Sequence, residues 1–155
     1  MEIYNKTVNE IRKFNRFYTV TMGFLSSGYL DSDYSIAETR ILFELKNHGS
    51  CIQNDIVKTL HIDKSYLSRI IQRFCKKGLV EKMKSDDDKR ATKITLTETG
   101  KTETERLIAL TNRKIQSQLM DLKCDKDECD KLCNALNTVI SILGKEEVTH
   151  ESNSI

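Results

Sequence analysis

The 155 residues of this chain are enough for one domain with a helical extension, and 38% hydrophobic with 31% charged residues excludes an intrinsically disordered protein. No run approaches the 18 consecutive apolar residues of a membrane span, and the polar N-terminus lacks the apolar core of a signal peptide, so we expect a cytoplasmic protein with no membrane partner. The net charge of +2 averages over opposed segments: residues 61–90 hold nine Lys and Arg against five Asp and Glu (+4), and residues 121–151 four against eight (−4). The first of these segments suits a polyanionic partner and the second does not.

The first predicted element is a long amphipathic helix from residue 3 to about residue 25. Apolar side chains recur along it at steps of three and four residues, which is the spacing of one helix face. These side chains are Ile11, Phe14, Tyr18, Met22 and Leu25. A loop is predicted to follow, from Gly28 to Tyr34.

Two short helices with capping signals are predicted after this loop. Ser35 and Glu38 match the capping box, in which each side chain satisfies a backbone N–H of the other residue. The helix that they open should run to His48 and end at Gly49 in a left-handed conformation. The run 50–53 repeats the capping pattern and predicts a second, shorter helix.

A third short helix completes a helix-turn-helix pattern. Asp63 is placed to cap it, Leu67, Ile70, Ile71 and Phe74 should face inward, and Gly78 should end it. Because only the tight turn at residues 61–62 separates it from the helix before, the spacing is typical of a helix-turn-helix unit.

A two-stranded hairpin is predicted next. Residues 79–84 and 92–96 carry β-branched and apolar residues at strand spacing, and residues 85–90 between them form a polar, charged turn. A hairpin directly after a helix-turn-helix is the wing of a winged-helix domain.

Two further helices are predicted beyond the wing. Thr97 is placed to cap the first, and a loop at residues 123–125 separates it from the last helix, which Gly144 should end. The last helix carries a long apolar stripe: Cys129, Leu132, Cys133, Leu136, Val139, Ile140 and Leu143. The first and last helices expose more apolar surface than a wing domain covers, so we expect them to pack against a second copy of the chain.

The predicted fold is therefore mostly α-helical with a small β-hairpin wing. We assign residues 1–30 to an N-terminal dimerisation helix, 35–100 to a winged helix-turn-helix DNA-binding domain, 101–144 to C-terminal dimerisation helices and 145–155 to a flexible tail.

The order of these elements and their residues resemble the MarR family (multiple antibiotic resistance regulators). The matching runs are Ile41-Leu42-Phe43-Glu44-Leu45, Ile62-Asp63-Lys64-Ser65-Tyr66-Leu67-Ser68-Arg69-Ile70-Ile71, Lys77-Gly78-Leu79-Val80-Glu81, Asp88-Lys89-Arg90 and Ile94-Thr95-Leu96-Thr97-Glu98-Thr99-Gly100. Singly these patterns are weak, but together, in this order and at these separations, they are specific.

The resemblance implies a homodimer with interleaved terminal helices that regulates transcription at a pseudo-palindromic operator, as a repressor that a small molecule or an oxidant releases. An activator stays open. The wing departs from a basic, phosphate-facing loop because it carries three successive aspartates at residues 86–88.

The third helix of the motif should enter the major groove of double-stranded DNA with its outward face. That face holds Lys64, Ser65, Tyr66, Ser68, Arg69, Gln72 and Arg73. Arginine can pair with guanine O6 and N7, glutamine with adenine, and lysine with phosphate. At the wing, we expect Arg90 to enter the minor groove, with Asp88 orienting it and Lys89 beside it. The alternative is that both surfaces are ordinary solvated polar faces that do not bind DNA.

Four aromatic side chains are candidate walls of an effector pocket, although helical aromatics are more often core: Phe14, Phe17, Tyr18 and Phe43. Among the cysteines, Cys51 and Cys124 are candidate redox sensors. Cys51 is near a helix start, where the helix dipole could activate it, although simple packing is an equal alternative, and Cys124 is in a loop. Cys129 and Cys133 could share a metal, but they lie on an apolar stripe, where cysteine acts as a small hydrophobe. We expect no metal and no cofactor.

An enzyme is the first rival interpretation. The chain has no glycine-rich phosphate loop, no paired catalytic carboxylates and no nucleophile elbow, so we expect no catalytic residue. The second rival is a winged-helix protein-interaction module without specific DNA binding. Arg69 and Arg90 argue against it, because such a module needs no cations at both groove-facing positions.

Overall fold

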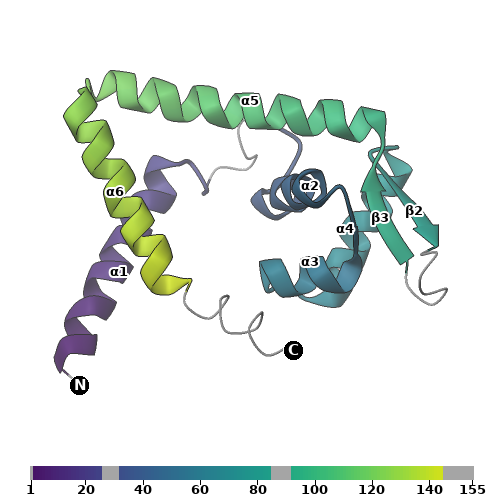
Figure 1. The fold of residues 1–155 in the computed structure, drawn as a ribbon, viewed down its shortest axis with the longest axis horizontal. Helices are drawn as coiled ribbons and strands as arrows, with labels where there is room; N and C mark the ends of the chain where they lie inside the picture. Colours follow the sequence, from purple (N-terminus) through teal and green to yellow (C-terminus); the bar gives the residue numbers. More distant parts are fainter. Residues whose placement is uncertain (1, 26–31, 85–91, 145–155) are drawn as a thin grey trace, which may run out of the picture. The chain divides into compact units, whose positions relative to one another are not determined.

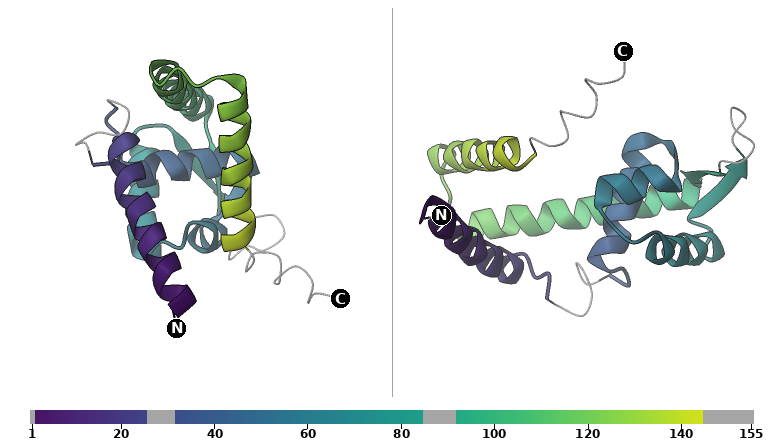
Figure 2. Two further views of the ribbon diagram at one scale, coloured as in Figure 1. Left: turned by 90° about the vertical axis from the view of Figure 1, so that its left-hand side faces the viewer. Right: turned by 90° about the horizontal axis from the view of Figure 1, so that it is seen from below.

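A computed structural model of the chain describes residues 2–25, 32–84 and 92–144, shown in Figures 1 and 2. The elements are α1 (Glu2–Thr21), α2 (Ile36–His48), β1 (Ser50–Ile52), α3 (Gln53–Leu60), α4 (Lys64–Lys76), β2 (Val80–Lys84), β3 (Thr92–Leu96), α5 (Glu98–Asp121) and α6 (Lys126–Leu143). The chain divides into two compact units within α5, residues 1–114 and residues 115–155. The mostly helical fold with a small sheet agrees with the predicted fold class.

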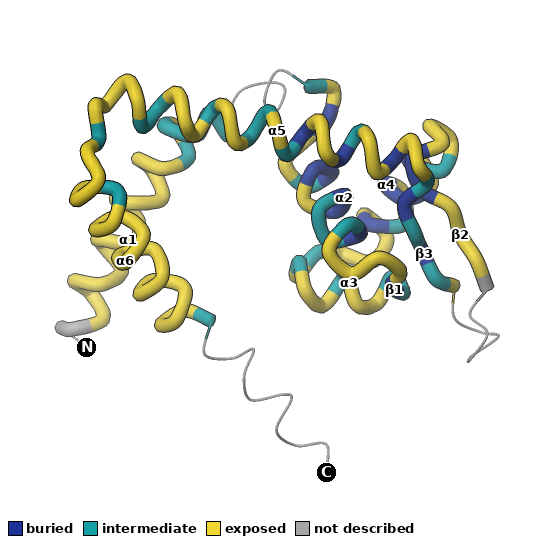
Figure 3. The backbone as a smooth tube through the Cα atoms, turned by 45° about the horizontal axis from the view of Figure 1, so that its top comes forward, coloured by how far each residue is buried: buried dark blue, intermediate teal, exposed yellow. Residues whose placement is uncertain are grey.

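The core of the first unit lies between α2, α3, α4, the start of α5 and a three-stranded antiparallel sheet of order β1-β3-β2. In Figure 3 the residues coloured as buried lie on these elements. Phe74, Leu67 and Ile94 are fully buried there, and burying one such side chain stabilises a fold by about 1.5–3 kcal/mol. The inward face of α4 is the predicted one, because all four of its predicted core residues are buried.

The capping box at the start of α2 is confirmed. The Ser35 hydroxyl accepts from Glu38 N at 3.2 Å, and Ser35 N donates to Glu38 Oε2 at 2.9 Å. At the other end, Gly49 has a φ of +71° with a ψ of −64°. The glycine is needed for its positive φ, but its ψ lies outside the left-handed helical region that the sequence predicted.

Two predicted helix limits are wrong. Residues 50–52 do not cap a helix: they form strand β1, in which Cys51 pairs with Ile94 of β3. Ile52 takes the N-cap position of α3 without a side-chain oxygen, and its N–H donates to Asp55 instead. Backbone pairing with β3 satisfies this segment's polar groups better than one capping hydroxyl would, and it makes the expected two-stranded hairpin a three-stranded sheet.

The first helix is shorter than predicted. It ends at Thr21 rather than near residue 25, because Gly23 has a φ of +70°, a conformation that stops a helix. The remaining caps agree with the sequence: Asp63 accepts from Tyr66 N at 2.8 Å, and Thr97 Oγ1 accepts from Gly100 N at 3.0 Å.

The helices α1 and α6 leave their apolar side chains largely exposed. No residue of α6 is buried, and both helices are exposed almost throughout in Figure 3. Within residues 2–25, 32–84 and 92–144, no helix is long and apolar enough to cross a membrane.

Candidate nucleic-acid interface

Helix α4 presents a polar face because its apolar residues are all used in the core. Asp63 caps its N-terminus, and Leu67, Ile70 and Phe74 anchor its inner side. In a helix, residues three and four apart lie on one face, so the polar residues between these anchors must point away from the core.

The predicted outward residues lie where the sequence placed them. Lys64, Ser65, Tyr66, Arg69, Gln72 and Arg73 are exposed, and Ser68 is half-buried. In the described part of the chain, no hydrogen bond or ion pair engages the side chain of Lys64 or Arg69. Both cations are therefore available to an anionic ligand.

Arg73 differs from the other cations of α4. Its Nη2 lies 2.5 Å from Oε1 of Glu38 in α2, and the Glu38 side chain is only 9% exposed. The same carboxylate accepts from Ser35 N through Oε2. Arg73 is therefore paired within the fold, a contact that sequence reasoning missed because Glu38 was interpreted only as a capping residue.

The end of α4 is also held by Tyr34, just before α2. The Tyr34 ring lies edge-on to that of Phe74, with centroids 6.2 Å apart, and the Lys77 ammonium lies 4.9 Å from the centre of the Tyr34 ring. Burial, followed by the neighbouring carboxylate of Glu103, raises the pKa of the Tyr34 hydroxyl. Glu38 thus contacts Arg73 of α4, and Tyr34 contacts both Phe74 of α4 and Lys77, which follows the helix.

The predicted tip of the wing, Asp88, Lys89 and Arg90, lies outside the described residues. The register of the strands below it adds one candidate. Lys82 pairs with the buried Ile94 and follows the buried Val80 by two residues. Side chains two residues apart in a strand share a face, so Lys82 lies on the core side of the sheet. It is exposed there.

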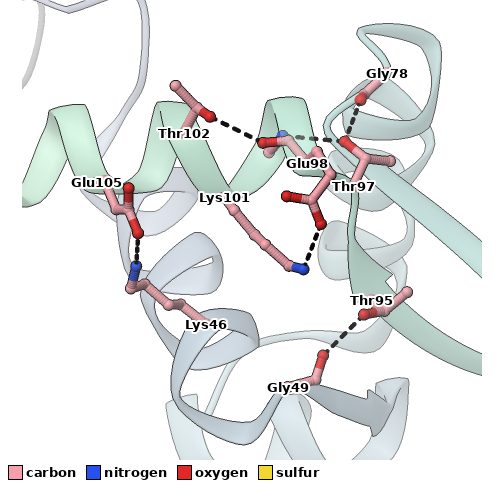
Figure 4. A network of polar contacts seen from close by, with 10 residues as sticks. Lys46, Gly49, Gly78, Thr95, Thr97, Glu98, Lys101, Thr102 and Glu105 are labelled. Atoms are coloured by element: carbon pink, nitrogen blue, oxygen red, sulfur yellow. Dashed lines mark hydrogen bonds and ion pairs between the residues drawn. The ribbon is translucent and has the colours of Figure 1, made fainter.

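A polar network ties α2, the sheet and α5 together (Figure 4). Lys46 Nζ lies 2.6 Å from Glu105 Oε1, and Thr95 Oγ1 donates to the carbonyl oxygen of Gly49 at 2.9 Å. Thr97 Oγ1 donates to the carbonyl oxygen of Gly78 at 2.6 Å. These contacts fix the ends of α2, α4 and β3 relative to the first turns of α5.

The four candidate pocket residues divide into two groups. On α1, the rings of Phe14 and Tyr18 stack with centroids 5.3 Å apart, and Phe17 is exposed. Phe43 instead packs against the winged-helix core.

The structure has a shallow hollow at a different place. Its lining residues are Tyr34, Lys77, Leu79, Glu98, Thr99, Thr102 and Glu103. None of the four predicted wall residues contributes to it.

The cysteines are all free thiols in the described residues. Cys51 is buried in β1, and burial, with the nearby carboxylates of Asp55 and Glu44, raises its pKa to about 11. This is the opposite of the activation by a helix dipole that the sequence suggested, because Cys51 lies in a strand.

The remaining sensor candidates lie around the start of α6. Cys124 is half-buried, Cys129 is half-buried and Cys133 is exposed. Burial raises the pKa of Cys129, and the neighbouring thiols and carboxylates add to the rise. Among the described His, Cys, Asp and Glu residues, no group of three could hold a metal ion.

Comparisons with known proteins match the same region. The sequence model of the MarR family matches residues 34–92. The HTH-type transcriptional regulator SarZ of Staphylococcus haemolyticus is 27% identical over 109 residues, which cover 70% of this chain and 71% of that protein.

Solved structures share the fold. The apo form of MarR from E. coli superposes with a TM-score of 0.70 at 23% identity, covering 85% of this chain and 94% of that one. A cysteine-to-serine mutant of the same protein, complexed with operator DNA, has a TM-score of 0.68 at 22% identity and covers 90% and 99%.

Proposed function

We propose that this chain is a transcription regulator of the MarR family and not an enzyme, and that it binds double-stranded DNA sequence-specifically; the sequence model of that family matches residues 34–92, and the transcriptional regulator SarZ is a relative. The chain would act as a homodimer on a pseudo-palindromic operator. The observation that carries the proposal is the outward face of α4, on which Lys64 and Arg69 are exposed and unpaired among the described residues. The related MarR structure that contains operator DNA supports it.

The chemistry of the α4 face fits the major groove. Ser65 at the start of the helix is small enough for close approach to the bases, and Arg69, one turn later, can donate two hydrogen bonds to guanine. Lys64 at the helix start would contact phosphate and fix the register without reading sequence. Tyr66, Ser68 and Gln72 complete the proposed reading face.

The wing would read the neighbouring minor groove. Arg90 is the proposed inserted cation, with Lys89 on the phosphates and Asp88 orienting Arg90. Lys82, on the core side of the sheet, joins them as a proposed phosphate contact. Replacing Arg90 with alanine should weaken operator binding ten-fold or more while the dimer persists, and undiminished binding in a gel-shift titration would contradict this role.

The second copy would cover α1 and α6. Large apolar side chains are exposed on both helices, among them Phe17 at 65% and Ile140 at 67%. Exposed apolar surface of this extent marks an interface, and a two-fold dimer would present two α4 helices to successive turns of the duplex.

Repression, release by a small molecule or an oxidant, and action in the cytoplasm complete the proposal. The effector would bind beside the aromatic residues of α1, Phe14, Phe17 and Tyr18, with Phe43 on the winged-helix side. Cys124 is the better of the two proposed redox residues, since Cys51 is buried with a raised pKa.

A salt titration separates the proposed function from a protein-interaction module. Fluorescence anisotropy would follow binding to a labelled duplex selected from a random-sequence pool and to an unselected duplex of equal length. For a DNA reader, log K falls linearly with log salt, and the selected duplex binds 10³-fold or more tightly. Affinity that is weak, indifferent to salt and equal for both duplexes would support the interaction module.

A further inference from the structure

The ion pair between Glu38 and Arg73 assigns a role to two residues that the proposed DNA reading leaves unused. We propose that Glu38 is a positioning residue, which withholds Arg73 from the DNA phosphates and fixes the angle of α4 on α2. This inference rests on the proposed function. Both residues belong to the winged-helix unit.

The first observation is that Glu38 has both carboxylate oxygens engaged. Oε2 accepts from Ser35 N at 2.9 Å, within the capping box of α2, and Oε1 contacts Nη2 of Arg73 at 2.5 Å. The carboxylate is almost fully buried while the arginine is half exposed, with side-chain exposures of 9% and 53%. A buried carboxylate needs a partner, so Arg73 is the residue that compensates it.

The second observation is where Arg73 lies on α4. It follows Arg69 by four residues, so the two arginines share one side of the helix. Arg69 has no partner among the described residues, whereas Arg73 does. The sequence alone therefore gives α4 two equivalent groove-facing arginines, and the structure neutralises one of them.

The third observation is that the Glu38–Arg73 ion pair is one of several contacts at the C-terminal end of α4. Tyr34 packs against Phe74, and Lys77 lies over the Tyr34 ring. The short segment 34–38 therefore contacts residues 73, 74 and 77. A helix held at its C-terminal end in this way presents its N-terminal half, with Lys64 and Arg69, in a fixed direction.

The consequence for DNA binding is specific. A cation paired within the protein releases no counterion from DNA, whereas a free arginine on the same face would add a phosphate contact that carries no sequence information. Glu38 therefore lowers non-specific affinity and preserves the orientation that reading requires. A purely structural ion pair would change stability but not the number of phosphates contacted.

The test uses the full chain, its Glu38→Gln variant and the Glu38→Gln/Arg73→Gln double variant. Glutamine also completes a capping box, so Glu38→Gln removes the charge while the hydrogen bond from Ser35 N can persist. Thermal unfolding at one protein concentration would verify that each variant is folded. Binding to an unselected duplex and to a pool-selected duplex would be measured over a salt series.

In Glu38→Gln, the freed Arg73 should steepen the salt dependence on the unselected duplex by about 0.9 in log–log slope, the value of one added phosphate contact. The preference for the selected duplex should fall roughly ten-fold, the scale of one disturbed base-pair contact. In the double variant the slope should equal that of the unmodified chain, because the paired arginine contributed no phosphate contact there.

Equal slopes for Glu38→Gln and the unmodified chain would overturn the inference. So would a slope about 0.9 flatter in the double variant, since it would mean that Arg73 already contacts phosphate, and this second comparison decides the matter even if Glu38→Gln alone does not fold. Failure of the proposed function is distinct, because the unmodified chain itself would then show no steep salt dependence on either duplex.

Discussion

Lys64 is the first residue of α4, where a cation is electrostatically misplaced. The N-terminus of a helix carries partial positive charge, and no ion pair offsets Lys64 in the described part of the chain. Its side chain is exposed beside the Asp63 cap. A residue that is unfavourable for the helix and free of partners suits contact with a phosphate.

Replacing Lys64 with alanine should lower affinity for every duplex and flatten the salt dependence by about 0.9 in log–log slope. Stability should stay unchanged or rise slightly, because the unfavourable charge at the helix start is gone. Anisotropy titrations over a salt series would measure the slope. Lys101→Ala is the matched control, since Lys101 is paired with Glu98 on α5, and an unaltered slope in Lys64→Ala would exclude the contact.

Cys51 should be the least reactive thiol of the folded protein. Its pKa is raised from 9.0 to about 11, which leaves about 100-fold less of the reactive thiolate at pH 8. Alkylation with iodoacetamide at pH 8, followed by mass spectrometry, should modify Cys51 slowly in the native protein and quickly after unfolding in urea. Equal rates in the two states would contradict the burial of this thiol in β1.

At the scale of elements, the start of α5 crosses the start of β2 at very short range. A Cβ placed on Gly100 would lie 1.9 Å from the carbonyl oxygen of Leu79, and that oxygen already accepts from Thr97 N at 3.0 Å. Only a glycine permits this approach, because the neighbouring atom is backbone and cannot turn aside.

Gly100→Ala should therefore destabilise the fold by about 3 kcal/mol, the upper range for overpacking a close contact. Denaturant unfolding followed by circular dichroism would measure the loss. The neighbouring Thr99→Ala, at an exposed position of the same helical turn, should change stability by less than about 0.5 kcal/mol. Similar values for the two variants would mean that α5 does not approach Leu79 so closely.

At the scale of the whole molecule, the exposed apolar side chains of α1 and α6 are the main feature that one chain leaves unexplained. Leu136, Val139 and Ile140 of α6 are all exposed, although they form one stripe. A contiguous exposed apolar stripe of this kind marks a surface that a partner covers.

Light scattering should give twice the chain mass of 17.9 kDa at micromolar concentration. Leu136→Glu would place a charge in the proposed interface and should shift the protein toward monomer, with loss of tight binding to a two-half-site duplex. Asn134→Glu, on the opposite side of α6, should leave the dimer intact. A monomeric unmodified chain would remove the dimer from the proposal.

The sequence by itself determined the elements whose signals are local. Helical spacing, the Ser35–Glu38 and Asp63 caps, and the alternation at residues 92–96 depend on neighbours within a few residues, and the structure reproduces all of them. The outward face of α4 followed for the same reason, because a buried stripe fixes the opposite side of the helix.

Tertiary structure decided what depends on partners distant in the chain. Residues 50–52 carry a capping pattern, yet they pair with strand β3. No local sequence signal could predict this pairing, because β3 is distant in the chain. Glu38 and Arg73 are 35 positions apart (73 − 38), so only the packing of α4 on α2 turns one of two similar arginines into an internal partner. Burial and neighbouring carboxylates likewise raised the pKa of Cys51. A thiol's pKa depends on the surrounding fold and not on its position in the sequence.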